Sequence, residues 1–156
     1  MNYMQYINGD DANGRGMRCT LFVSGCEMAC VGCHNKESWK LTAGSLYTKE
    51  FEDQIIEDLK SPFIEGFSVS GGHPLHPKVF LEVLKLCKRV KIETGKSVWL
   101  WTGLTLEELQ ADKTRCKILN WTEVLIDGKF VQELKDASLK WKGSSNQRVI
   151  NVKEVL

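Results

Sequence analysis

The sequence lacks an excess of charge of either sign. Its 156 residues include 21 basic and 20 acidic side chains, which gives a net charge of +1. A basic patch is the electrostatic footprint of nucleic-acid binding, and a polybasic segment attracts a protein to an anionic membrane. The balanced composition therefore predicts that neither a nucleic acid nor a membrane is a partner.

Long apolar runs and an export signal are also missing. No run reaches the roughly 18 residues that a membrane-spanning helix needs. Residues 1–11 contain neither an apolar core nor an early positive charge, so they do not resemble a signal peptide. We therefore expect a cytoplasmic protein, in which the six cysteines are reduced thiols or metal ligands rather than disulfides.

The chain has no linker, internal repeat or low-complexity segment, and we expect a single domain over residues 1–156. Strand and helix patterns alternate along it. Strands are predicted at 17–23, 63–69, 97–101, 122–126 and 148–152. Helices are predicted at 48–60 and 77–90, and a short third helix begins at the capping box Thr105-Leu106-Glu107-Glu108.

This alternation predicts the fold class. Strands separated by helices pair in parallel through right-handed crossovers, and ligands of such folds bind at the carboxyl ends of the strands. A closed eight-fold barrel needs about 250 residues, so we predict an α/β fold built as a partial, open (β/α) barrel with a mostly parallel sheet. An open side suits a macromolecular substrate, because small ligands are typically ~70–90% buried.

Three cysteines lie close together in the loop after the first predicted strand, at Cys26, Cys30 and Cys33. Thiolates are soft ligands for zinc, copper(I) and iron–sulfur clusters. With no fourth cysteine nearby, the spacing favours a [4Fe–4S] cluster that keeps one iron for a ligand from outside the protein. Two alternatives stay open: a zinc site with His34 as the fourth ligand, and a c-type haem, because residues 30–34 spell C-x-x-C-H.

Further candidate residues give weaker signals. Gly71 and Gly72 lack side chains and can let backbone amides approach a ligand closely, or they form a tight turn. His73 and His76 are candidate metal ligands, although a turn histidine is more often solvated. Asp127 is a candidate for binding a ribose hydroxyl, although Asp-Gly is also an ordinary turn. We interpret four tryptophans as core and edge aromatics rather than a cofactor cage: Trp99, Trp101, Trp121 and Trp141.

The cysteine pattern, followed by Gly71-Gly72-x-Pro74, resembles the radical S-adenosylmethionine (SAM) superfamily. Finer motifs over nearly the whole chain resemble the activating proteins of anaerobic ribonucleoside-triphosphate reductases. These motifs are Asn13-Gly14-x-Gly16-x-Arg18-Cys19-Thr20-Leu21-Phe22-Val23-Ser24-Gly25-Cys26, Gly32-Cys33-x-Asn35, Trp99-x-Trp101-Thr102-Gly103, Asp127-Gly128-Lys129-Phe130 and Trp141-x-Gly143-Ser144-x-Asn146-Gln147.

The resemblance implies that Cys26, Cys30 and Cys33 bind three irons of a [4Fe–4S] cluster and that SAM chelates the fourth. Reduced flavodoxin or a similar donor would supply an electron, and SAM would be cleaved to methionine and a 5′-deoxyadenosyl radical. That radical would take a hydrogen from a glycine near the C-terminus of the reductase's large subunit. The implied cofactor-binding residues are Gly32, Cys33, His34, Gly71, Gly72 and His73.

No catalytic side chain beyond the cluster ligands is assigned. Two other classes of function stay open: activation of a different glycyl-radical enzyme, and a non-catalytic zinc-binding interaction module.

Two positions depart from the family pattern. Gly32 stands where many superfamily members have an aromatic residue, and we expect His34 to substitute for it in part. His73 stands where the family usually has an acidic residue. A neutral imidazole can accept a hydrogen bond from the cofactor's ammonium group, so we expect His73→Asp, a charged acceptor, to tighten SAM binding.

Overall fold

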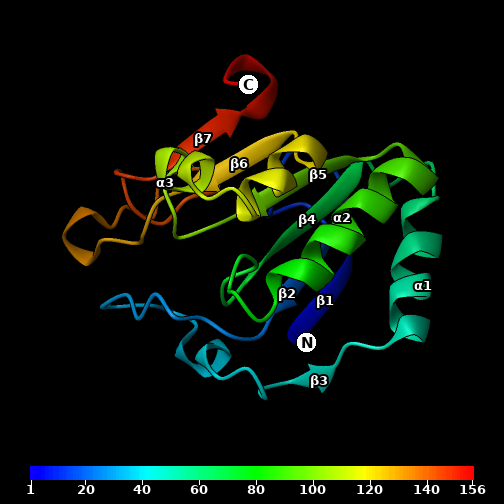
Figure 1. Ribbon diagram of the computed structural model, residues 1–156, viewed down its shortest axis with the longest axis horizontal. Helices are drawn as coiled ribbons and strands as arrows, with labels where there is room; N and C mark the ends of the chain where they lie inside the picture. The colour runs from blue at the N-terminus through cyan, green and yellow to red at the C-terminus, as the bar shows by residue number, and fades with distance from the viewer.

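The computed structural model describes residues 1–156 and contains one seven-stranded sheet (Figure 1). Its strands, in sheet order, are β3 (Ser45–Leu46), β1 (Asn2–Asp10), β2 (Arg18–Val23), β4 (Gly66–Gly71), β5 (Ser97–Trp101), β6 (Val124–Asp127) and β7 (Arg148–Asn151). The four central strands, β2, β4, β5 and β6, are parallel to one another. Antiparallel strands flank them on both sides, so the predicted open α/β sheet with a parallel centre is confirmed.

The helices connect the parallel strands, and α1 and α3 begin directly after the predicted capping residues. They are α1 (Lys49–Leu59), α2 (Phe80–Thr94) and α3 (Leu106–Ala111), with 3-10 turns η1 (Lys36–Trp39), η2 (Arg115–Trp121), η3 (Gln132–Leu134) and η4 (Val152–Glu154). At the start of α1, Thr48 Oγ1 accepts a hydrogen bond from the Phe51 amide. None of these helices combines the length and the apolar character that crossing a membrane would require.

The capping box of α3 forms as predicted. Thr105 Oγ1 accepts from the Glu108 amide at 3.1 Å, and the Glu108 carboxylate accepts from the Thr105 amide at 2.8 Å. We expect Thr105→Ala to lower the free energy of unfolding by about 1 kcal/mol, because the Glu108 amide loses its partner. Urea unfolding measures this loss. Thr114→Ala is the matched control, since Thr114 precedes η2 without a side-chain cap, and equal losses in the two variants would contradict the prediction.

The N-terminal strand β1 is an element that the sequence does not predict. Its residues, NYMQYINGD, have little of the apolar alternation that marks a strand. Antiparallel pairing with β2 holds this segment in the sheet instead. Tyr3 and Tyr6 pack against Phe51 of α1, with ring centroids 4.2 and 5.4 Å apart. The β1–β2 register shifts twice, between Tyr3 and Gln5 and between Asn8 and Asp10, so β1 is irregular along its length.

Two predicted elements, β4 and α2, begin three residues later than expected. The residues before β4 form a turn in which the Ile64 amide donates to the Ser61 carbonyl, so the strand begins at Gly66. The residues after Pro77 also form a turn, with the Val79 and Phe80 amides both donating to the His76 carbonyl. In each case a local turn competes with the regular element.

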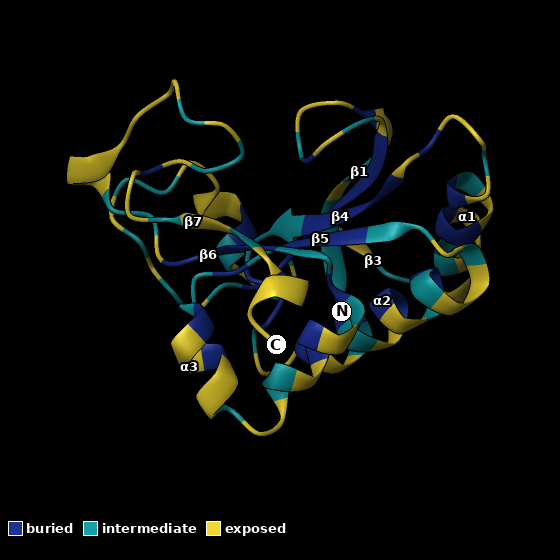
Figure 2. Cartoon of the chain, turned by 90° about the horizontal axis from the view of Figure 1, so that it is seen from above, coloured by how far each residue is buried: buried dark blue, intermediate teal, exposed yellow.

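The two faces of the sheet differ in character (Figure 2). Helices α1, α2 and α3 lie along one face, while loops cross the other. Alternate residues of the strands form the core beneath the helices: Cys19, Leu21, Val23, Phe67, Val69, Val98, Leu100 and Leu125. Their neighbours on the opposite face include Arg18, Thr20, Ser68, Trp99 and Trp101, as the two-residue period of a strand requires. The helix-free face is therefore the one with polar and aromatic groups to offer a ligand.

Candidate functional site

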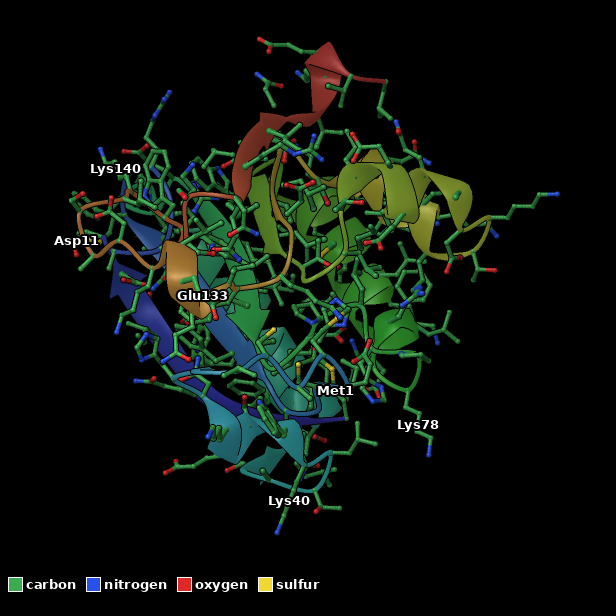
Figure 3. The ribbon with its side chains drawn as sticks, turned by 90° about the vertical axis from the view of Figure 1, so that its left-hand side faces the viewer. Met1, Asp11, Lys40, Lys78, Glu133 and Lys140 are labelled. Atoms are coloured by element: carbon green, nitrogen blue, oxygen red, sulfur yellow. The ribbon has the colours of Figure 1, made fainter.

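A cavity of about 410 Å³ lies at the carboxyl ends of the parallel strands. The loops after β2, β4, β5 and β6 all contribute to its wall, which confirms that the candidate loops meet at one edge. The loop after β2 and the segment containing η3 both project to the left in Figure 1. Seen from that side, several sulfur atoms gather near the centre of the view, with Glu133 of η3 to one side (Figure 3). The cavity is lined by Asn13, Cys26, Met28, Cys30, Cys33, His34, Asn35, Ser70, Gly71, Gly72, His73, Trp101, Thr102, Gly103, Gly128, Phe130, Trp141, Lys142, Gly143 and Gln147.

The loop after β2 carries the three cysteines and is fixed at its base. The Gly25 amide donates to the Ser38 carbonyl at 2.7 Å, and the Cys26 amide donates to the Trp39 carbonyl at 3.1 Å. Cys26, Cys30 and Cys33 all line the cavity as free thiols. Burial raises the pKa of the Cys26 thiol, with the neighbouring Glu27 carboxylate adding to the effect. The thiols thus share one cavity wall while the loop base holds them near β2.

The arrangement of these thiols bears on the kind of metal site. A single zinc ion needs its ligands within about 2.0–2.3 Å of one point, and no three His, Cys, Asp or Glu side chains are so arranged. A cubane cluster places each thiolate on a different iron, so its ligands need not converge on one point. The Asn35 amide donates to Cys33 Sγ at 3.4 Å, a contact that also suits a cluster thiolate. Three free thiols in one cavity are the kind of donor that a cluster uses.

Close backbone packing requires glycine, without a Cβ, at positions 71 and 72. Gly71 has φ +106°, and a Cβ there would lie 2.4 Å from the Val23 nitrogen; a Cβ on Gly72 would lie 2.5 Å from the Gly25 carbonyl oxygen. The Gly72 amide donates to Val23 and the His73 amide to Gly25, at 2.8 and 2.7 Å. The Gly72 and His73 amides therefore bond within the protein rather than to a ligand. The Gly72 carbonyl accepts no hydrogen bond.

His73 is buried, and both of its ring nitrogens are occupied. Nδ1 lies 2.8 Å from Glu27 Oε1, and Nε2 lies 2.8 Å from Thr102 Oγ1. The expectation that this imidazole accepts a hydrogen bond from a cofactor therefore conflicts with the geometry. His76 Nδ1 accepts from the Lys78 amide at 3.0 Å, and neither histidine belongs to a group of three side chains arranged to hold a metal ion.

The interpretation of the tryptophans needs correction. Trp99 is buried, and Trp121 packs against the core as expected, but Trp101 and Trp141 line the cavity. Trp101 Nε1 donates to the Trp141 carbonyl at 2.7 Å, and Trp141 has a left-handed φ of +66°. A bulky residue in that conformation is held there by its surroundings. Both residues therefore belong to the candidate site rather than only to the core and its edge.

Asp127 has a structural role in place of the suggested ribose contact. Its carboxylate is buried and accepts from the Leu106 amide at 2.7 Å and from Arg148 Nε and Nη2 at 3.1 and 2.5 Å. Arg148 also donates to Glu107 and lowers the pKa of that carboxyl to about 2. Asp127 thus joins the end of β6 to α3 and β7, and its neighbour Gly128 is the residue that lines the cavity.

Several cavity residues were not identified from the sequence: Asn13, Met28, Ser70, Phe130, Lys142 and Gln147. Asn13, Phe130 and Gln147 belong to motifs that carry the family resemblance, and this membership is the one sign in the sequence that they contribute to the site. Gly32 was assigned to the cofactor but does not line the cavity. A Cβ at Gly32 would instead lie 2.9 Å from the Gln132 side chain, so this glycine permits packing of the cysteine loop on η3.

Comparison with known proteins agrees with this site. Residues 12–150 match the family described as the 4Fe-4S single cluster domain, which defines the class of protein. The anaerobic ribonucleoside-triphosphate reductase-activating protein of Escherichia coli K12 is 52% identical over 152 residues, covering 96% of this chain and 97% of that protein. The proteins of the same name from Vibrio cholerae and phage T4 are 52% and 36% identical, covering 94% and 96% of this chain and 96% and 93% of their own lengths.

The chain therefore belongs to the family of anaerobic ribonucleoside-triphosphate reductase-activating proteins. Its cysteines lie in a 4Fe-4S cluster domain, so the zinc and haem alternatives for this stretch give way to an iron–sulfur site.

Proposed function

We propose that this protein cleaves SAM reductively and generates a glycyl radical on the large subunit of an anaerobic ribonucleoside-triphosphate reductase. The observation that carries the proposal is the shared cavity: three cysteines and the glycine loop line the same cavity in a chain of the reductase-activating family. When bound, the cluster would supply the electron, taken from flavodoxin or a similar donor, that cleaves the sulfur–C5′ bond of SAM. The products would be methionine and a 5′-deoxyadenosyl radical, which would take a hydrogen from the partner's glycine.

In this proposal the chain binds and orients both cofactors. Cys26, Cys30 and Cys33 would hold three irons of the cluster, and the fourth iron would be left to the amino and carboxylate groups of SAM. An amino group that coordinates a metal through its lone pair keeps its N–H groups as hydrogen-bond donors. The Gly72 carbonyl is our candidate acceptor for such a donor, because it accepts no hydrogen bond within the protein and Gly72 lines the cavity.

The adenine end of SAM is assigned to the aromatic part of the cavity. The His34 ring lies 5.9 Å from the Phe130 ring, and both residues line the cavity. This pair supports the expectation that His34 compensates for the missing aromatic at Gly32. Trp101 and Trp141 complete an apolar wall that keeps water away from a reactive radical.

The protein substrate is assigned to the open side of the sheet. We infer that the sheet is a partial barrel, since its edge strands β3 and β7 do not pair with each other and the face without helices is crossed by loops alone. A glycine-bearing loop of the reductase can reach the cavity from that side. Activation of another glycyl-radical enzyme is the second candidate, and it uses the same site.

Partner binding is expected to couple SAM cleavage to radical formation. Without the reductase the cavity stays open to water, so 5′-deoxyadenosine accumulates slowly and without a glycyl radical. With the reductase's large subunit, we expect about one glycyl radical per 5′-deoxyadenosine formed, by the stoichiometry of hydrogen transfer. Chromatography counts the nucleoside, and electron paramagnetic resonance counts the radical.

Anaerobic reconstitution and the radical assay together separate the alternatives. A protein that binds zinc and stays colourless after anaerobic reconstitution with iron and sulfide would refute the proposed chemistry. A glycyl radical that forms only on a different glycyl-radical enzyme would leave the chemistry intact and change the partner.

A further inference from the structure

A continuous chain of hydrogen bonds links Glu27, His73 and Thr102. Both contacts of the imidazole measure 2.8 Å, and the His73 side chain is only 1% exposed. Thr102 Oγ1 also accepts from the Leu104 amide at 3.1 Å. Glu27 belongs to the cysteine loop, His73 to the loop after β4, and Thr102 to the loop after β5. One buried side chain therefore ties together three of the four loops that form the cavity.

The hydrogen-bonding capacity of the partners fixes how the imidazole is used. An ionised carboxylate can only accept a hydrogen bond. His73 Nδ1 therefore carries a hydrogen and donates it to Glu27 in a hydrogen bond. Thr102 is able to donate to Nε2 or to accept from it. His73 thus has no ring nitrogen left over for a ligand, although the residue lines the cavity. Residue 73 of this chain acts on the protein and not on the cofactor.

Two further contacts strengthen the link between these loops. The His73 amide donates to the Gly25 carbonyl at 2.7 Å, at the base of the cysteine loop. At the loop after β5, a Cβ built on Gly103 would lie only 2.8 Å from Met28 Cγ, so Met28 packs directly against that glycine. The cysteine loop is therefore held on both sides of Glu27, and its attachment does not depend on a metal.

We propose that His73 is a positioning residue that fixes the cysteine loop against the loops after β4 and β5 through Glu27 and Thr102. The inference rests on the proposed function, because the value of a fixed loop is to present thiols and SAM in one geometry. An aspartate at position 73 would place a carboxylate near the Nδ1 position, opposite Glu27. The two like charges would repel and release the loop, which reverses the effect first expected for His73→Asp.

The test compares His73→Asp with His76→Asp, a matched change in the same loop at a histidine whose side chain hydrogen-bonds to the Lys78 amide and not to the cysteine loop. In the metal-free protein, hydrogen–deuterium exchange over residues 26–39 is expected to accelerate at least about ten-fold in His73→Asp and to stay unchanged in His76→Asp. After reconstitution, calorimetry is expected to show SAM binding at least about ten-fold weaker in His73→Asp.

Two variants keep the result interpretable if His73→Asp folds poorly. His73→Asn retains a donor near Nδ1 for Glu27, and Glu27→Gln with His73→Asp restores a donor–acceptor pair with its direction reversed. Both are expected to recover exchange protection and SAM affinity to within about three-fold of the wild type. Tighter SAM binding in His73→Asp with unchanged exchange would overturn the proposal, as would a double variant no better than His73→Asp. A wild-type protein that fails to bind SAM would refute the proposed function alone, since the exchange measurement needs neither metal nor cofactor.

Discussion

Cys30→Ala, reconstituted anaerobically with iron and sulfide, is expected to hold no stable [4Fe–4S] cluster and to lose SAM cleavage to background. Three thiolates are the whole set of cysteine ligands in this cavity, and the other three cysteines lie elsewhere in the fold. Loss of one leaves two irons without a protein ligand, so the cluster falls apart or converts to a smaller form. The same result is expected for Cys26→Ala and Cys33→Ala.

Cys87→Ala is the matched control for these variants. Cys87 is fully buried in α2, and burial raises the pKa of its thiol to about 12, so it stays a neutral part of the core. This variant is expected to keep the cluster and SAM cleavage. Iron and sulfide analysis with an electron paramagnetic resonance spectrum of the reduced protein measures the outcome. Full cluster content and full activity in Cys30→Ala would show that this thiol is not a ligand.

Arg148→Ala is expected to lower the free energy of unfolding by about 3 kcal/mol. The substitution removes two hydrogen bonds from the Asp127 carboxylate, whose side chain is 1% exposed, and leaves that charge with only the Leu106 amide. Breaking a buried ion pair by removing one partner costs about 3–5 kcal/mol, and the half-exposed Arg148 puts this pair at the lower end. Urea unfolding of the metal-free protein at pH 7 gives the value.

Glu107→Gln is the control, because it removes the exposed partner of the same arginine and leaves Asp127 paired. Its effect should be much smaller, as for surface ion pairs in general. The folded pKa of Glu107, about 2, is lower than its unfolded value, so its contribution is present above the unfolded pKa and fades only as pH falls through about 2. The ranking of the two variants should therefore hold from pH 6 to 8. Equal losses would show that Asp127 does not depend on Arg148.

The elements that were predictable from sequence are those with strong local signals. The capping residues Thr48 and Thr105 place the starts of α1 and α3, and the apolar run of β5 gives that strand its observed bounds of Ser97–Trp101. β1 has no comparable signal, because its order comes from pairing with β2 and from aromatic packing on α1. Such contacts join residues far apart in the chain, and no local pattern reveals them.

In the candidate site too, features with a local sequence signal were predictable and features set by long-range contacts were not. The cysteine spacing and the order of strands and helices are enough to predict that the thiols lie beside Gly71 and Gly72. The role of His73 could not be predicted, because its partners Glu27 and Thr102 lie 46 and 29 residues away in the sequence. Trp101 was also ambiguous: β5 is apolar on both faces, and only the position of the helices decides which face its alternate residues occupy.

The two register shifts in β1 have a consequence for how this chain avoids associating with itself. β3 covers only Asn2 and Tyr3 on the outer side of β1, so most of this strand is an unpaired edge. A regular edge of that length would be a template for a strand from a second molecule, and a bulge breaks the even spacing of amide and carbonyl groups on which such pairing depends. At the other edge, β7 has only four residues. Irregularity at one edge and short length at the other therefore protect the open sheet against edge-to-edge aggregation.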